Sequence, residues 1–128
     1  MSYYFTKKLS GDFDQTIDKV TEALKAEGFG VLTEIDIKAT LKKKLDVDFY
    51  NYRVLGACNP GFAHKALQAE NKIGTMLPCN VIVQEREAGV IEVSAVDPAA
   101  SMMAVENEKL GEVAGQVRDK LKGIIEGL

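Results

Sequence analysis

The sequence of 128 residues lacks the features that mark several large protein classes. It has no apolar run approaching the roughly 18 residues that a membrane-spanning helix needs. Its N-terminus has neither the long apolar segment nor the cleavage site of a secretory signal, so we expect a cytoplasmic protein with no membrane partner. It also has no glycine-rich dinucleotide fingerprint, no Walker motif and no serine in a nucleophile elbow. These absences disfavour nucleotide-dependent and serine-hydrolase chemistry.

An excess of basic charge is missing as well. The chain has 16 Lys and Arg residues against 19 Asp and Glu residues, for a net charge of −3. Proteins that bind nucleic acid usually show a basic excess or a concentrated basic face. The one dense basic run, Lys42 to Lys44, is explained by a solvated helix face. We therefore expect no nucleic-acid partner.

Cysteine and histidine are scarce, with two cysteines and one histidine in the chain. In a reducing cytoplasm such thiols stay unpaired unless they take part in redox or metal chemistry. The rest of the composition, 46% hydrophobic and 27% charged residues, is typical of an ordinary globular domain. A chain of this length suits one hydrophobic core, which predicts a single domain over residues 1–128.

The best-determined element is a helix that begins at Asp12. This residue has Gln15 three positions further on, as in a capping box. An apolar stripe at spacings of four, three and four follows it. Gly28 ends the helix where a left-handed residue costs least. The stripe consists of Phe13, Ile17, Val20 and Leu24.

Two further helices are predicted to begin with a capping residue followed by proline, at Asn59-Pro60 and at Asp97-Pro98. The last is expected to run on to the C-terminus and to bury a stripe that consists of Leu110, Val113, Val117, Leu121, Ile124 and Leu128. The predicted order is β-α-β-α-β-α-β-β-α. The strands are expected at 3–9, 31–35, 50–57, from 78 and at 90–96, and the helices from 12, over 37–45, from 59 and from 97.

The last two predicted strands are joined by a turn at residues 87–89, as in a hairpin. A hairpin makes the sheet mixed or partly antiparallel, which disfavours a doubly wound parallel sheet. We therefore predict an α+β fold, a single domain with a sheet of about five strands packed with helices.

Three motifs in order carry a family resemblance: residues 52–67 (YRVLGACNPGFAHKAL), 77–81 (LPCNV) and 96–98 (VDP). Residues 34–37 (EIDI) and 45–48 (LDVD) precede them. The chain resembles family 302 of the domains of unknown function. The resemblance implies a small α+β domain of bacteria and archaea that commonly associates as a homodimer, with no established reaction.

Cys58, His64 and Cys79 form the one constellation with suggestive chemistry. If the third and fourth strands are neighbours, their side chains converge. Two thiolates and an imidazole suit a soft transition metal such as zinc or copper. Asn59 and Asn80, each beside a cysteine, extend this into a candidate ligand-binding site.

Burial is the simpler explanation of the two cysteines, since free cysteine behaves as a small hydrophobe. Strand alternation groups Cys79 with Val81 and Val83, and groups Cys58 with Val54 and Gly56. We expect both groups to face inward. The spacing also matches no standard zinc signature.

Three functional hypotheses remain open. The first is a non-enzymatic module that binds a small ligand or a metal near Cys58, His64 and Cys79. The second is a thiol-based enzyme for redox or sulfur-transfer chemistry, with Cys58 as nucleophile and His64 as its base. The third is a structural, dimeric interaction domain without a ligand. A homodimer is expected separately, since a second copy can cover the sheet edges.

Overall fold

A single sheet organises the chain in the computed structural model, which describes residues 2–128. Its strand order is β1-β5-β4-β3-β2, and every pairing is antiparallel. The predicted α+β fold with a five-stranded sheet is confirmed, and the sheet is antiparallel throughout. The strands are β1 (Tyr4–Ser10), β2 (Gly30–Asp36), β3 (Asn51–Cys58), β4 (Cys79–Glu87) and β5 (Val90–Val96).

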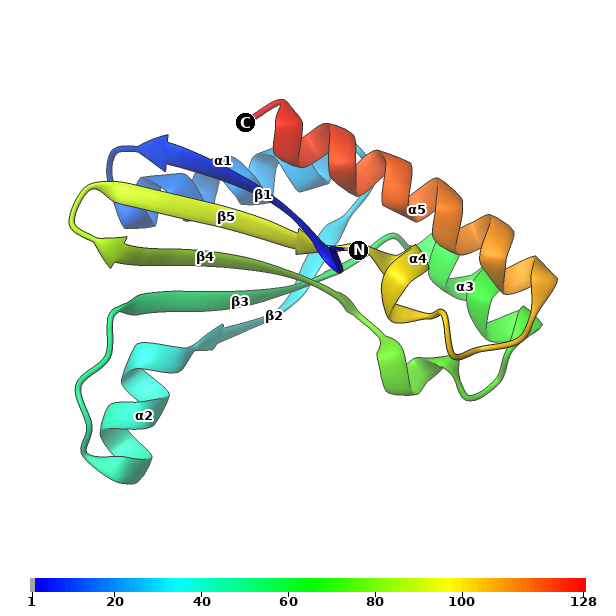
Figure 1. Cartoon of the computed structure of the whole chain (residues 1–128), viewed down its shortest axis with the longest axis horizontal. Helices are drawn as coiled ribbons and strands as arrows, with labels where there is room; N and C mark the ends of the chain where they lie inside the picture. The colour runs from blue at the N-terminus through cyan, green and yellow to red at the C-terminus, as the bar shows by residue number, and fades with distance from the viewer. Residues whose placement is uncertain (1) are drawn as a thin grey trace.

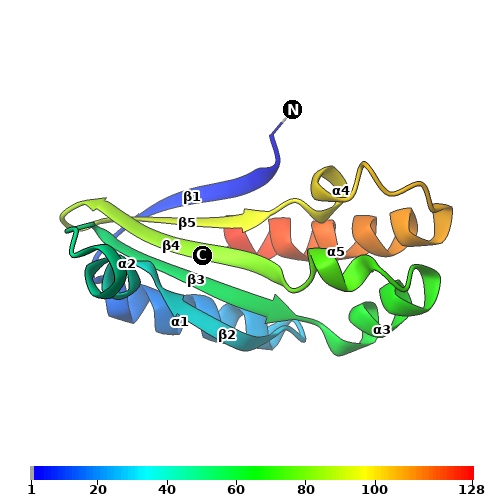
Figure 2. The ribbon, with the colours of Figure 1, turned by 90° about the horizontal axis from the view of Figure 1, so that it is seen from below.

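The long helices α1 and α5 cover one face of this sheet, and α3 lies beside α5 at one end (Figures 1 and 2). Within residues 2–128, no helix is both long and apolar enough to cross a membrane. The helices are α1 (Phe13–Ala26), α2 (Ile37–Leu45), α3 (Pro60–Ala69), the 3-10 helix η1 (Ile73–Met76), α4 (Pro98–Ser101) and α5 (Glu108–Glu126).

Local sequence determines where α1 begins and ends. The side chain of Asp12 accepts a hydrogen bond from the Gln15 backbone N–H at 2.9 Å, as a helix N-cap does. At the other end Gly28 has a φ of +85°, and the Phe29 N–H donates back to the Leu24 carbonyl at 2.9 Å. Both predicted ends of this helix are confirmed.

The predicted C-terminal helix is divided in two. Asp97 caps a single turn, α4, by accepting from the backbone N–H groups of Ala99 and Ala100. The chain then leaves the helical path, and Asn107 caps α5 by accepting from Lys109 and Leu110. A second N-cap starts a second helix, because an N-cap residue itself has extended backbone geometry. The interpretation of one helix from residue 97 was therefore wrong, although the buried stripe of its second part was placed correctly.

The core lies between the sheet and the two long helices. The whole predicted stripe of α1 is buried in it. From the predicted stripe of α5, Val113 and Leu128 are half-buried and the other members are buried. The side chains that lie deepest include Val20, Leu24, Phe29, Leu55, Val81, Val83, Ile91, Val93 and Leu121.

In the part of the chain that the structure describes, the opposite face of the sheet has no helical layer over it. Helix α2 projects on that side, away from the rest of the domain (Figure 1), and none of its residues is buried. Leu45 at its end is 66% exposed, and the neighbouring Val47 is 43% exposed. Within residues 2–128, the fold thus leaves one sheet face and the apolar side of α2 without a covering partner.

Candidate functional site

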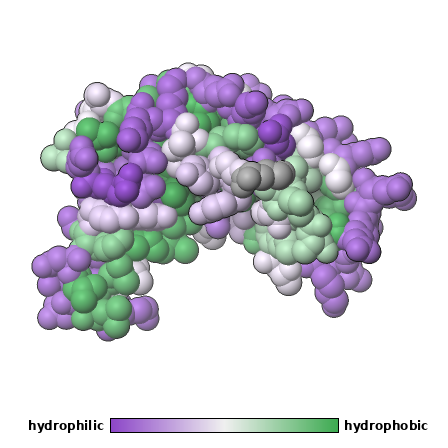
Figure 3. All heavy atoms as spheres, in the orientation of Figure 1, coloured by the Kyte–Doolittle hydropathy of each residue, from purple (hydrophilic) through white to green (hydrophobic). Residues whose placement is uncertain are grey.

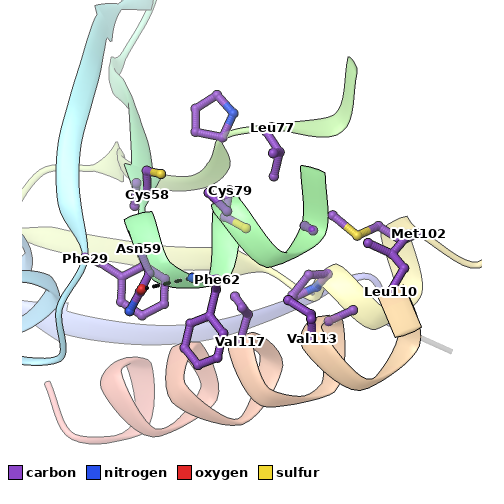
Figure 4. Close-up of a pocket in the computed structure, with 16 residues that line it drawn as sticks. Phe29, Cys58, Asn59, Phe62, Leu77, Cys79, Met102, Leu110, Val113 and Val117 are labelled. Atoms are coloured by element: carbon purple, nitrogen blue, oxygen red, sulfur yellow. Dashed lines mark hydrogen bonds between the residues drawn. The ribbon is translucent and has the colours of Figure 1, made fainter. Parts of the chain in front are cut away.

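The antiparallel pairing of β3 with β4 brings the two cysteines to one end of the sheet. Ala57 lies directly opposite Cys79 in the register, and Cys58 follows Ala57. Both cysteines and Asn59 line a cavity between α3, α5 and the strand ends (Figure 4). The condition for convergence, that the third and fourth strands are neighbours, is met.

The two thiols lie on opposite faces of the sheet. Cys79 is buried together with Val81 and Val83, as predicted. Since Ala57 is the residue that shares its face, the next residue, Cys58, points the other way and is half-buried. Figure 4 shows the sulfur of Cys79 pointing toward α5, with Cys58 farther from that helix. The expectation that the face of Cys58 is an inward one was therefore wrong.

Cys79 has the properties of a core side chain. Burial raises the pKa of its thiol to about 11, and the nearby Cys58 thiol adds to the rise. The thiolate is the form that attacks electrophiles and binds metals. At neutral pH, Cys79 therefore stays protonated and acts as a small hydrophobe.

His64 does not join the cysteines. It is exposed on α3, and it is absent from the cavity lining, because Ala66 rather than His64 is the helix residue that packs inward. Within residues 2–128, no three His, Cys, Asp or Glu side chains are placed to hold a metal ion. The predicted set of Cys58, His64 and Cys79 is thus not assembled as a zinc or copper site.

The cavity beside the cysteines is small and apolar. Its volume is about 40 Å³, whereas pockets for small molecules usually measure about 300–1,000 Å³. Asn59 has a structural role there, since its side-chain oxygen accepts from the Phe62 backbone N–H at 3.4 Å and caps α3. The cavity is therefore a packing defect of the core in size and in chemistry. Its lining includes Phe29, Phe62, Leu77, Met102, Leu110 and Val117.

Asn80 belongs to a different and larger site, a basin on the bare face of the sheet. The basin has a volume of about 510 Å³. Figure 3 shows that the molecule is hollowed on this side, between α2 and the opposite end. We call this site the tyrosine basin, because all four tyrosines of the chain line it. Its lining is Tyr3, Tyr4, Tyr50, Tyr52, Asn80, Ile82, Gln84, Arg86, Glu92, Ser94, Ala95 and Val96.

The tyrosines of the basin come from segments far apart in the chain. Tyr3 and Tyr4 pack edge to face with ring centroids 5.0 Å apart, and the rings of Tyr50 and Tyr52 lie 6.0 Å apart. Burial raises the pKa of the Tyr52 hydroxyl, and the nearby Tyr50 and Tyr3 add smaller effects. Tyr52 therefore remains a hydrogen-bond donor at neutral pH.

Polar side chains alternate with apolar ones along the floor of the basin. Asn80, Ile82 and Gln84 occupy alternate positions of β4, so all three face the basin. Within residues 2–128, the side-chain amides of Asn80 and Gln84 form no hydrogen bond, in contrast to Ser94, whose hydroxyl lies 2.9 Å from that of Thr6. The two charged groups of the basin are paired, with Arg86 Nη2 3.3 Å from Glu92 Oε2.

Sequence reasoning missed the basin, although part of its signal was present. The alternation that places Val81 and Val83 inward also places Asn80, Ile82 and Gln84 outward on the same strand. The missing part is the pairing of β1 with β5, which sets Tyr4 opposite Val96 and brings the N-terminal tyrosines to the basin. No spacing within the sequence carries that long-range pairing.

Together these features describe a one-sheet α+β domain with helices on one face and a concave, aromatic face opposite. The chain belongs to the family described as "Domain of unknown function DUF302", whose model matches residues 5–128. A solved structure, "Crystal structure of uncharacterized conserved protein DUF302 from Bacillus stearothermophilus", is similar to it, with 28% identity and a TM-score of 0.90 over 98% of each chain. Among curated proteins, none matches this chain.

Proposed function

We propose that this protein is a non-enzymatic module that binds a small ligand, and that the ligand lies in the tyrosine basin. One observation carries the proposal: the fold gathers all four tyrosines of the chain, from two distant segments, around one concave site. Ligand sites are typically concave and aromatic, with a few polar groups that orient the ligand. The cavity at the cysteines is far smaller, and the side-chain oxygen of Asn59 in its lining already caps α3.

The protonation and pairing of the side chains in the basin favour binding over catalysis. The group whose pKa is shifted there, Tyr52, is shifted upward, so it stays a donor and supplies no general base. Arg86 and Glu92 neutralise each other. What remains is a set of rings, hydroxyls and amides, which can hold a molecule without transforming it.

A chemically diverse fragment set tests the proposal through ¹H–¹⁵N correlation spectra of the whole chain. We expect shifts that concentrate on residues of the basin and disappear in Tyr52→Leu. Cys58→Ser is the matched control and should bind as the wild type does. Shifts that instead map to Cys79, Phe62 and the small cavity, and that survive Tyr52→Leu, would overturn the proposal.

We also propose that the protein acts as a homodimer, for which α2 is the supporting feature. Three apolar side chains, Ile35, Leu45 and Val47, are each more than 40% exposed on or beside this helix. Exposed apolar clusters of this kind usually mark interaction surfaces. β2, which leads into α2, is also an edge strand of the sheet, and a second copy can cover its outer edge.

Sedimentation tests the dimer. We expect a species of twice the 14.0 kDa chain mass, which Leu45→Asp converts to the monomer. Met103→Asp is the matched control, because Met103 is equally exposed, at 69%, but lies far along the chain from α2. A wild type that stays at 14.0 kDa at micromolar concentration would contradict the dimer.

Both cysteines are free, as in a reducing compartment, and we propose that the protein is located in the cytoplasm.

A further inference from the structure

We infer that the ligand of the tyrosine basin is an uncharged, planar, fused-ring nitrogen heterocycle, the chemical class of nucleosides and flavins without their phosphates. This inference rests on the proposed binding function of the basin and goes beyond it by naming the ligand class. Three features of the basin carry it: the spacing of the Asn80 and Gln84 amides, the faces of the tyrosine rings, and the pairing of the two charged residues, Arg86 and Glu92, found in its lining among residues 2–128.

The two amides define the length of the ligand. Asn80 and Gln84 lie four residues apart on β4, so their Cα atoms are about 13 Å apart along the strand. Ile82 lies between them and supplies an apolar floor. A side-chain amide has both donors and acceptors, so it pairs with ring nitrogens and exocyclic groups. A flat molecule of two or three fused rings, polar at its edges, fits between two such groups.

The tyrosines provide flat surfaces beside that floor. Tyr52 lies directly opposite Gln84 in the β3–β4 register, so its ring adjoins one end of the amide row. Tyr50 extends the same aromatic wall and stacks on Phe49, with ring centroids 4.1 Å apart. Proteins hold flat heterocycles by stacking them on aromatic rings and by hydrogen bonds to their edges. Both elements are present in the basin.

The charges of the basin disfavour a phosphate. Among residues 2–128, Arg86 is the one cationic residue that lines the basin, and it is paired with Glu92. Lys8 also lies opposite Glu92 in the β1–β5 register, outside the lining. An anionic ligand would have to enter beside the Glu92 carboxylate, in a protein of net charge −3. The same argument disfavours a nucleic-acid strand, whose affinity comes mainly from contacts of basic groups with phosphates. The ligand is therefore the neutral ring system.

Two matched pairs of probes test the ligand class: adenosine against AMP, and riboflavin against FMN. Each pair shares its rings and differs by one phosphate. The readout is the side-chain amide signals of Asn80 and Gln84 in ¹H–¹⁵N spectra, with the exposed Gln116 on α5 as internal control. We expect adenosine or riboflavin to shift the signals of Asn80 and Gln84 but not that of Gln116, and the phosphorylated partner to bind more weakly.

Substitutions distinguish the hydrogen bonds made by the two amides from the stacking on Tyr52. Asn80→Leu and Gln84→Leu should each weaken binding by about three- to tenfold, since each leaves a polar edge of the ring unpaired. Tyr52→Leu should weaken binding at least about fivefold by removing the stacking surface. Gln116→Leu, on the exposed side of α5, should bind as the wild type does.

The possible outcomes distinguish this inference from the proposed function. If saturated fragments such as cyclohexanediol shift the basin while adenosine and riboflavin do not, the basin binds ligands but the inferred class is wrong. If the phosphorylated probes bind as tightly as the neutral ones, the argument from charge is wrong. If no probe or fragment shifts the basin, both the inference and the proposed function fail.

Discussion

Cys79 and Asn80 are consecutive residues of one strand, yet they belong to two regions with opposite properties. Cys79 faces the helices, in a core that leaves a cavity of about 40 Å³. Asn80 faces the bare side of the sheet, in a basin of about 510 Å³. The residues with the more reactive chemistry, the thiols, thus lie by the region that is packed, and the unreactive amides and tyrosines line the region with room for a ligand. The two regions therefore differ mainly in whether their side chains face the core or the bare side of the sheet, and less in the reactivity of those side chains.

The largest expected difference between the two faces is in the free energy of unfolding. Ile91 is fully buried on the helix-covered face, and Ile91→Ala should cost about 2–5 kcal/mol. Ile82 is half-buried on the bare face, and the same substitution there should cost at most about half as much. Urea denaturation of both variants checks this. Equal losses would mean that the bare face is covered in the folded protein by a layer not seen in the single chain.

Thiol reactivity should also differ sharply between Cys58 and Cys79. A pKa raised from 9.0 to about 11 lowers the thiolate fraction of Cys79 about a hundredfold at neutral pH, and burial slows access further. We expect iodoacetamide to label Cys58 first, by at least about a hundredfold in rate. Peptide mass spectrometry measures both rates, and the denatured chain serves as control because its two thiols should react alike. Equal rates in the folded protein would contradict the assignment of Cys79 to the core.

The raised pKa of Cys79 also predicts a dependence of stability on pH. Below about pH 9, the thiol is protonated in both states, so its contribution to stability is fully present. As the pH rises from 9 toward 11, the unfolded thiol ionises first, and stability is lost. Cys79→Ala should therefore lose less stability over that interval than the wild type. Identical slopes for the two proteins would show that the folded thiol titrates as an ordinary one.

A substitution at Gly56 tests how closely the chain is packed on the bare face at the end of β3. A Cβ on this residue would meet the side chain of Thr33 and come within 2.8 Å of the Pro78 ring. We expect Gly56→Ala to destabilise the protein by about 1–3 kcal/mol through overpacking. Gly30→Ala is the matched control, because nothing lies within 4 Å of the added carbon on that neighbouring strand. Thermal denaturation of both variants gives the comparison, and similar midpoints would contradict it.

The smallest expected effect separates the two asparagines that follow the cysteines. Asn59→Ala removes the N-cap of α3 and should cost about 1 kcal/mol of stability without changing ligand affinity. Asn80→Ala removes no hydrogen bond within residues 2–128 and should leave stability nearly unchanged while weakening binding. The two variants are thus expected to affect different properties, and a loss of affinity from Asn59→Ala alone would place the ligand at the small cavity and not in the basin.

Structural features that depend on neighbouring residues were predicted well from the sequence, and features that depend on long-range contacts were not. The caps at Asp12 and Asn59 and the stop at Gly28 depend on hydrogen bonds within a few residues, so the pattern of residue types contains them. The inward face of Cys79 followed from alternation. The face of Cys58 did not, because both faces of β3 are apolar at that end, with Leu55 and Ala57 on one side and Val54 and Gly56 on the other.

The proposed binding surface depends on contacts that no local pattern encodes. Tyr4 reaches the basin only because β1 pairs with β5, more than 90 residues away at Val96. The exclusion of His64 likewise depends on how α3 is rotated against α5. The residues that the sequence groups into one candidate site therefore divide between two places: Cys58, Asn59 and Cys79 line the small cavity, and Asn80 lines the basin.

Native mass spectrometry of the gently purified protein tests the central claim most directly, with wild type, Tyr52→Leu and Cys58→Ser compared under the same conditions. The account predicts that the wild type and Cys58→Ser carry the same excess mass of a small organic molecule and that Tyr52→Leu carries none. Excess mass that persists in Tyr52→Leu and disappears from Cys58→Ser would contradict it and return the site to the cysteines.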